Sequence, residues 1–209
     1  MNIALINASP KRSESASGAL LSDLKGLLPD DQIVKSFSMN RPSIAEEEIK
    51  ELCGCESWIF SFPLYVDGIP SHLVSCLYQI EQLGIKNQNI YIYAVSNSGF
   101  YEGKQNRNAL AILKNWCDKM GFVWGMGIGF GGGVALNSMK GVPLGKGPKS
   151  MLGSACRTLV NAVSSHATAD NIYITINLPR FLYQVLGEMG WRQEIKANGG
   201  KRRDLERRL

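Results

Sequence analysis

The sequence predicts a doubly wound α/β domain, a five-stranded parallel sheet with helices on both faces, and two observations lead to it. Short apolar, β-prone runs alternate along the chain with segments whose apolar residues recur at helical spacing, the order expected of βαβ units. With 44% hydrophobic and 20% charged residues, the 209-residue chain can build one sizeable core. We therefore expect a single domain over residues 1–200 and a flexible basic tail over residues 201–209.

The individual elements follow in order from these patterns. Five apolar runs are expected to form the strands, at residues 2–7, 33–37, 58–62, 90–95 and 123–130. Helical spacing predicts the helices, at residues 20–28, 44–52, 70–80, 110–120, 151–163 and 179–189. Leu20, Leu24 and Leu28, for example, share one helix face, and Pro29 ends that helix. Residues 172–176 are expected only as a short extended stretch.

The fifth apolar run is unusual because Gly125, Gly127 and Gly129 alternate in it with larger residues. One face of this strand is then nearly bare, so that backbone, a ligand or another chain can approach it closely. A homodimer that pairs at this face is one interpretation. A helix of the same chain that covers the glycines is the other.

The charge and the cysteine content limit the classes of partner and the cellular compartment that we expect. Of the net charge of +5, three charges come from the residues after Gly200, which we interpret as a frayed tail. No zinc-finger, RNA-recognition or Walker spacing is present, so no nucleic-acid partner is expected. The longest uncharged stretch, residues 120–139, holds seven glycines, which disfavour a spanning helix, so no membrane partner is expected. An apolar start without a basic leader and five scattered cysteines indicate a cytoplasmic protein with reduced thiols.

Binding residues are expected in the loops after the first, third and fourth strands, because ligands of such sheets lie beyond the carboxyl ends of the strands. The first loop, residues 7–18, offers four serines and two cations before a helix N-terminus, a composition suited to a phosphate. It lacks the glycine patterns of dinucleotide folds and of P-loops. The alternative is a serine-rich loop in which Ser17 merely caps the helix.

The other two loops suit a flat ring. In residues 62–70 two prolines stiffen the chain, Gly68 permits a sharp turn and Tyr65 offers a planar surface. An ordinary turn with Asp67 as a helix cap is the alternative. Residues 96–106 begin with small residues that allow a close approach, followed by two aromatic residues and by amide side chains that could read the edge of a heterocycle.

Three segments of these loops together resemble a known family. They are Ser9-Pro10-Lys11 with its serine run, Phe62-Pro63-Leu64-Tyr65-Val66-Asp67-Gly68-Ile69-Pro70, and Ser96-Asn97-Ser98-Gly99. Over about residues 1–130 the chain is similar to the NADPH-dependent FMN reductase-like proteins, which have the flavodoxin-like fold. The resemblance implies non-covalently bound FMN, NADH or NADPH as hydride donor, and a homodimer that pairs near the flavin.

The resemblance also implies which residues bind FMN. The phosphate would be contacted by residues of the first loop, namely Ser9, Lys11, Ser13, Ser15, Ala16 and Ser17. The isoalloxazine ring would lie against residues of the second loop, namely Pro63, Leu64, Tyr65, Val66 and Gly68. The other side of the ring would face residues of the third loop, namely Ser96, Asn97 and Gly99.

The leading functional hypothesis is an FMN-dependent oxidoreductase that takes a hydride from NAD(P)H and reduces a small acceptor: a quinone, a flavin, a nitro or azo compound or a similar molecule. Hydride transfer requires no proton-transfer side chain, so no catalytic acid or base is predicted. His72 and His166 are interpreted as surface or capping residues. No metal site is expected, because Cys53 and Cys55 are the only cysteines close together in the sequence.

Two other classes of function stay open. One is a flavodoxin-like electron carrier without nicotinamide turnover, although such carriers are typically acidic and this chain is basic. The other is a regulatory protein that has lost the cofactor, against which the intact serines of the first loop count. The lysines of the glycine-rich loop 131–149 could meet a 2′-phosphate or simply be solvated; they are Lys140, Lys146 and Lys149.

Overall fold

Two compact units make up the computed structural model of the chain, residues Met1–Asn177 and residues Leu178–Leu209. It describes residues 1–85, 89–139, 141–201 and 204. The first unit holds the sheet, and the second holds the last helix, α6 (Arg180–Ala197). Most of the expected basic tail lies outside the described residues, as does Lys140. A single domain over residues 1–200 stays a prediction.

Six parallel strands form the sheet of the first unit, in the order β2-β1-β3-β4-β5-β6. Their bounds are β1 Asn2–Asn7, β2 Ile33–Ser38, β3 Ser57–Pro63, β4 Tyr91–Ser98, β5 Val123–Gly131 and β6 Ile172–Thr175. The doubly wound α/β arrangement is confirmed, but the expected number of five strands is wrong by one. The sixth strand has four residues, too few to show a strand pattern in the sequence, and pairs with the end of β5.

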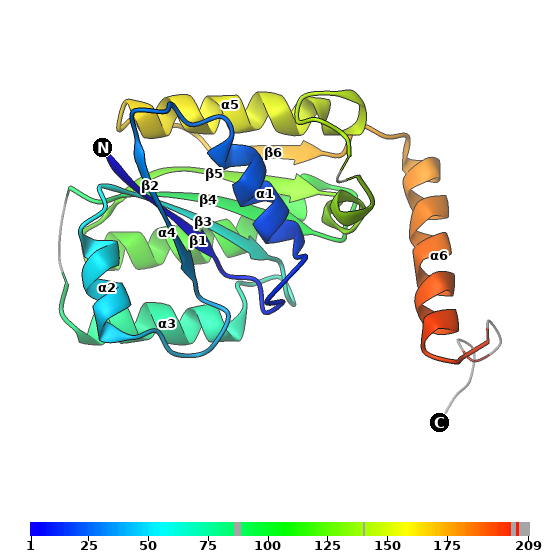
Figure 1. The fold of residues 1–209 in the computed structure, drawn as a ribbon, viewed down its shortest axis with the longest axis horizontal. Coiled ribbons are helices and arrows are strands. Elements are labelled where there is room, and N and C mark those ends of the chain that lie inside the picture. Colours follow the sequence, from blue (N-terminus) through cyan, green and yellow to red (C-terminus); the bar gives the residue numbers. More distant parts are fainter. Residues whose placement is uncertain (86–88, 140, 202–203, 205–209) are drawn as a thin grey trace. The chain divides into compact units, whose positions relative to one another are not determined.

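Helices cover both faces of this sheet (Figure 1). One face carries α1 (Ala16–Lys25) and α5 (Ser150–Ser164), and the other carries α2 (Glu46–Cys53), α3 (Ser71–Gln82) and α4 (Arg107–Met120). Three short 3-10 helices lie in the connections, η1 Gly103–Asn106, η2 Gly133–Met139 and η3 Gly147–Lys149. No described helix is both long and apolar enough to cross a bilayer.

The core on the α3–α4 face is built around aromatic rings. The ring of Phe122 packs edge-on against Trp58 and Trp116, with centroids 5.3 and 5.4 Å away. Trp58 is completely buried, and its indole N–H donates to the carbonyl oxygen of Cys55 at 3.2 Å. All of β3 before Pro63 is buried, as a central parallel strand with helices on both faces requires.

The bare face of β5 is covered by residues of the same chain. Gly125 sits at a register shift between β4 and β5, and the ring of Tyr93 fills the space that a side chain would need. Leu110 of α4 covers Gly127. At the end of the strand, a Cβ on Gly131 would lie 2.1 Å from the carbonyl oxygen of Tyr101, because the backbone before η1 packs directly on β5. These glycines therefore give no argument for a dimer.

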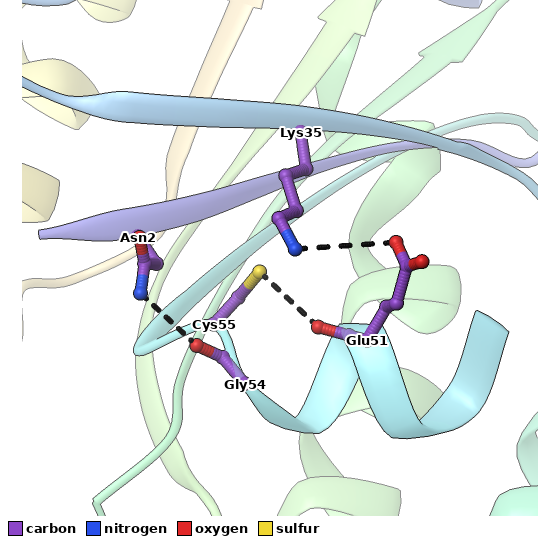
Figure 2. A network of polar contacts seen from close by, with 5 residues as sticks. All are labelled: Asn2, Lys35, Glu51, Gly54 and Cys55. Atoms are coloured by element: carbon purple, nitrogen blue, oxygen red, sulfur yellow. Dashed lines mark hydrogen bonds and ion pairs between the residues drawn. The ribbon is translucent and has the colours of Figure 1, made fainter. Parts of the chain in front are cut away.

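Polar contacts near the amino ends of the strands involve Cys55, one of the two neighbouring cysteines (Figure 2). The Cys55 thiol donates to the carbonyl oxygen of Glu51 at 3.7 Å, and the Glu51 carboxylate lies 3.9 Å from the Lys35 ammonium. Burial raises the pKa of the Cys53 and Cys55 thiols, so both stay protonated at neutral pH. Within the described ranges no three His, Cys, Asp or Glu side chains come together as a metal site.

Candidate functional site

The three predicted loops meet at the carboxyl edge of the sheet, where Asn97 joins them. Strand order reverses between β1 and β3, which makes this edge the switch point of the sheet. The Asn97 Nδ2 donates to Ser17 Oγ at 3.0 Å and to the carbonyl oxygen of Phe62 at 3.1 Å. The carbonyl oxygen of Asn97 accepts from the N–H of Leu64 at 2.8 Å. Because Asn97 is buried and both its amide hydrogens are used internally, its side chain positions the loops.

The start of α1 is set by Ser15. Its Oγ accepts a hydrogen bond from the Gly18 N–H at 3.0 Å, which makes Ser15 the N-cap. The alternative interpretation, in which Ser17 caps the helix, is therefore wrong. Ser17 lies two residues further along, in the first turn of the helix, and is buried, and its hydroxyl accepts from Asn97.

The first loop presents several hydrogen-bond donors to an anion. Ser9 Oγ accepts from the Lys11 N–H at 3.3 Å, and Ser15 Oγ accepts from Gly18. A hydroxyl that accepts still has its own O–H to donate, so Ser9 and Ser15 keep one donor each. The backbone N–H groups of Ala16 and Ser17 lie in the first helical turn, where the helix itself supplies no acceptor. Together with the helix dipole, these groups suit a phosphate.

A hollow of about 480 Å³ runs from this loop along α1. Arg12, Ser13 and Lys149 line it, and both loop residues among them are exposed. Lys149 is only 4% exposed, and its ammonium lies 2.8 Å from the Asp23 carboxylate on α1, which compensates the burial of the charge. The interpretation of Lys149 as a solvated lysine is therefore wrong, because its charge is buried and paired with a residue 126 positions away in the sequence.

The second loop contains a tight turn in an unusual conformation. The N–H groups of Tyr65 and Gly68 donate to each other's carbonyl oxygens at 3.1 and 3.0 Å. Between them Val66 and Asp67 have φ angles of 47° and 58°, in the left-handed region that β-branched residues rarely adopt. The expected sharp turn is present, but the positive φ falls on these two residues and not on Gly68. Asp67 does not cap α3, whose N-cap is Pro70.

The serines of the third loop face away from Asn97, because side chains alternate along β4. Ser96 Oγ donates to Asn106 Oδ1 at 2.8 Å, and Asn106 Nδ2 donates to Ser98 Oγ at 3.3 Å. The same amide also donates to the carbonyl oxygens of Gly103 and Phe130 at 3.0 and 3.2 Å. Buried Asn106 thus ties β4, η1 and β5 together, and the Ser96 hydroxyl is already occupied on the α4 side of the sheet.

The tips of the second and third loops remain open to solvent. Gly99 is exposed, and a Cβ there would lie 3.1 Å from the Cγ2 of Val134 in η2. Tyr65 and Phe100, the two rings that could cover a ligand, are 49% and 53% exposed. A flat ligand can therefore approach this edge without first displacing a packed aromatic side chain.

One of the two histidines, His72, touches the candidate site. His72, in the first turn of α3, is half-buried, and its Nε2 lies 3.1 Å from the carbonyl oxygen of Ala8. A ring N–H therefore donates to the backbone at the start of the first loop and helps to position it. His166 stacks on Tyr91 at a centroid distance of 4.8 Å, next to the end of α5.

These features define a flavodoxin-like fold in which the three candidate loops lie at the switch point. No protein-family model and no curated protein matches the sequence. Among solved structures, the chain is similar to an NAD(P)H:quinone oxidoreductase from Methanothermobacter marburgensis, with a TM-score of 0.55 and 14% identity over 76% of this chain and 96% of that one. An NADPH-quinone reductase from P. pentosaceus has a TM-score of 0.55 and 12% identity over 78% and 97%. A WrbA-like flavodoxin from Agrobacterium tumefaciens has a TM-score of 0.52 and 14% identity over 79% and 98%. The predicted flavodoxin-like fold is confirmed.

Proposed function

We propose that this protein is an FMN-dependent oxidoreductase that takes a hydride from NADH or NADPH and reduces a small acceptor: a quinone, a flavin, or a nitro or azo compound. The observation that carries the proposal is the connection of all three loops through Asn97, at the edge where sheets of this kind bind ligands. The description of two structural neighbours as quinone reductases supports the reaction class.

The residues of the first loop fit the phosphate of FMN. Its oxygens would accept from the N–H groups of Ala16 and Ser17 and from the hydroxyls of Ser9 and Ser15, while exposed Lys11 adds a positive charge. Ser13 and Arg12 lie beside these groups at the mouth of the hollow.

The ring system of FMN fits the opening between the second and third loops. Pro63, Leu64 and the Tyr65–Gly68 turn would support one side, and the backbone around Asn97 and Gly99 the other. Bound FMN supplies the hydride-accepting chemistry. The chain orients the ring, holds the phosphate and leaves room for a nicotinamide beside Gly99. We further propose that the protein is cytoplasmic and acts as a homodimer, with no nucleic-acid partner.

Titration of the purified protein with FMN and FAD tests the cofactor. We expect preference for FMN, because the first loop suits a terminal phosphate. Ser9→Ala removes one hydrogen bond to a charged group, about 1.5–3 kcal/mol or roughly tenfold to a hundredfold in affinity. Ser154→Ala, an exposed serine on α5, is the matched control and leaves the affinity unchanged.

Anaerobic mixing with NADH or NADPH then tests the reaction. A reductase loses its oxidised-flavin absorbance within seconds with at least one of the two nucleotides. If dithionite reduces the bound flavin and neither nucleotide does, the protein is an electron carrier. If no flavin binds, the assignment of the whole site is wrong.

A further inference from the structure

Asn7, the last residue of β1, contacts both ends of the segment that carries the proposed phosphate donors. Its Oδ1 accepts a hydrogen bond from the Ser9 N–H at 3.1 Å, and its Nδ2 donates to Ser15 Oγ at 3.5 Å. Asn7 also lines the hollow that begins at this loop. One side chain of the sheet therefore joins the two serines of the loop whose hydroxyls suit a phosphate.

The backbone of Asn7 is held on both sides by neighbouring strands. Asn7 pairs in register with Ser38 of β2 and with Ser61 of β3. Its carbonyl oxygen accepts from the Met39 N–H at 2.9 Å, and the N–H of Ala8 donates to the Ser61 carbonyl oxygen at 2.9 Å. A side chain on such a strand is positioned more precisely than one on a loop.

The hydrogen bonds also determine how the Asn7 amide and the Ser15 hydroxyl are oriented. A backbone N–H can only donate, so the Ser9 N–H faces the amide oxygen, and the amide nitrogen must be the group that donates to Ser15. The Gly18 N–H donates to the same hydroxyl oxygen at 3.0 Å. A hydroxyl oxygen has two lone pairs, and these two donors occupy them. The Ser15 hydrogen is therefore donated away from both groups.

Close packing keeps this arrangement in place next to the hollow. A Cβ on Gly18 would lie 3.1 Å from Ser15 Oγ and 3.3 Å from Asn7 Nδ2. Ser15 is only 6% exposed, and it lines the hollow together with Asn7 and Gly18. An acceptor bound at this end of the hollow can receive the Ser15 hydrogen without any change in the loop.

We propose that Asn7 is a positioning residue that fixes the Ser15 hydroxyl as a donor to the phosphate of FMN and thereby sets the preference for FMN over riboflavin. This inference rests on the proposed function, because it uses the phosphate site of the first loop. The second pKa of a phosphate monoester is about 6, so at pH 8 its terminal oxygens only accept. Riboflavin ends in a neutral hydroxyl at that place and gains less from a fixed donor, because hydrogen bonds to a charged group are the stronger ones.

Titration of the full chain with FMN and with riboflavin at pH 8, followed by flavin fluorescence, tests the proposal. We expect the unaltered chain to bind FMN more tightly than riboflavin. Asn7→Ala lowers the affinity for FMN about tenfold and leaves the affinity for riboflavin unchanged, because the lost contacts act on the phosphate. Asn2→Ala, which changes an amide at the other end of the same strand, leaves both affinities unchanged.

Asn7→Asp keeps the shape of the side chain and separates orientation from packing. The carboxylate still accepts from the Ser9 N–H, but it takes the Ser15 hydrogen instead of donating to the oxygen. We expect a larger loss of FMN affinity than with Asn7→Ala. Ser22→Asp is the control for charge repulsion, because Ser22 is exposed and lines the same hollow two helical turns beyond Ser15; its loss is smaller.

A double variant tests whether Asn7 acts through Ser15. Asn7→Ala lowers FMN affinity less in a Ser15→Ala background than in the unaltered chain, because the hydroxyl that it orients is then absent. Two fully additive losses show that Asn7 does not act through Ser15, which overturns the proposal.

The other contrary results are equally distinct. If Asn7→Ala lowers the affinities for FMN and riboflavin by the same factor, Asn7 only stabilises the loop and the proposal is wrong. If Asn7→Asp loses no more FMN affinity than Ser22→Asp, charge alone acts and the orientation argument is wrong; this comparison still decides if Asn7→Ala does not fold. If the unaltered chain binds FMN no more tightly than riboflavin, the phosphate site itself is misplaced, and if it binds neither flavin, the proposed function fails as well.

Discussion

Replacement of Asn97 by alanine is the most direct test of the candidate site, because the side chain joins three loops. The change removes two buried hydrogen bonds, to Ser17 and to Phe62, each contributing about 1 kcal/mol. The small cavity that is left adds to this cost. We expect the free energy of unfolding to fall by about 2–3 kcal/mol, a large part of the stability of a typical domain.

The assay compares stability and ligand affinity in the same variants. Urea unfolding of the protein without FMN measures the free energy of unfolding, and FMN titration measures the affinity. Asn106→Ala is the matched control, because it also removes buried hydrogen bonds but lies on the α4 side, away from the first two loops. Asn108→Ala changes an exposed amide on α4 and leaves both quantities unaltered.

We expect Asn97→Ala to weaken FMN binding at least tenfold more than Asn106→Ala does at a similar loss of stability. The reason is that Asn97, unlike Asn106, connects the phosphate loop to the ring loops. If both variants lose stability and Asn97→Ala binds FMN as tightly as the unaltered protein, the connection does not shape the binding site and the argument built on it fails.

Three further outcomes follow from contacts in the first unit. Gly131→Ala lowers the free energy of unfolding by more than about 2 kcal/mol in urea titrations, because its Cβ would lie 2.1 Å from a backbone oxygen. Gly187→Ala on α6 is the control and does not lower the free energy of unfolding, because its Cβ would have no atom within 4 Å. Asp23→Asn leaves the buried Lys149 ammonium without its anion. Because the carboxylate is 25% exposed, we expect a loss of about 1–3 kcal/mol in the free energy of unfolding, measured by thermal melts. The double variant Asp23→Asn with Lys149→Met recovers part of this loss. Burial raises the pKa of the Cys156 thiol from 9.0 to about 12. Between these pH values the folded state keeps a proton that the unfolded chain releases. The contribution of this thiol to the free energy of unfolding is therefore fully present below pH 9 and falls as the pH rises toward 12. The Tm at pH 10 is therefore lower than at pH 8, and Cys156→Ala reduces the difference.

The fold could be predicted because its strands and helices have strong, distinct periodicities. The exception, β6, has four residues and depends on pairing with the end of β5, which no local pattern reveals. The same limit applies to Lys149, whose burial depends on a carboxylate far away in the sequence. Alternation along β4, by contrast, already implies that Ser96 and Asn97 face opposite sides, and that inference could have separated their roles.

The turn of the second loop shows why residue identity alone misplaced a backbone conformation. Glycine is the cheapest residue at positive φ, so the sharp turn was assigned to Gly68. In the structure the paired hydrogen bonds of Tyr65 and Gly68 enclose Val66 and Asp67, and both of these residues adopt positive φ. Ser15 and Ser17 are equally good caps by type, and the hydrogen bond to Gly18 decides between them.

Val66 gives the second loop a property that a glycine there would not. A valine has few rotamers and few backbone states, so once the turn has forced it to a φ of 47° the segment has little freedom left to lose. The cost of that conformation, on the order of 1–3 kcal/mol, is met when the chain folds. A ligand that arrives later finds a loop that is already ordered, and the entropy of arranging it no longer counts against binding. Pre-organisation of this kind shows up as slow dissociation, so the Tyr65–Gly68 turn is expected to lengthen the residence time of any flat ligand held at this edge.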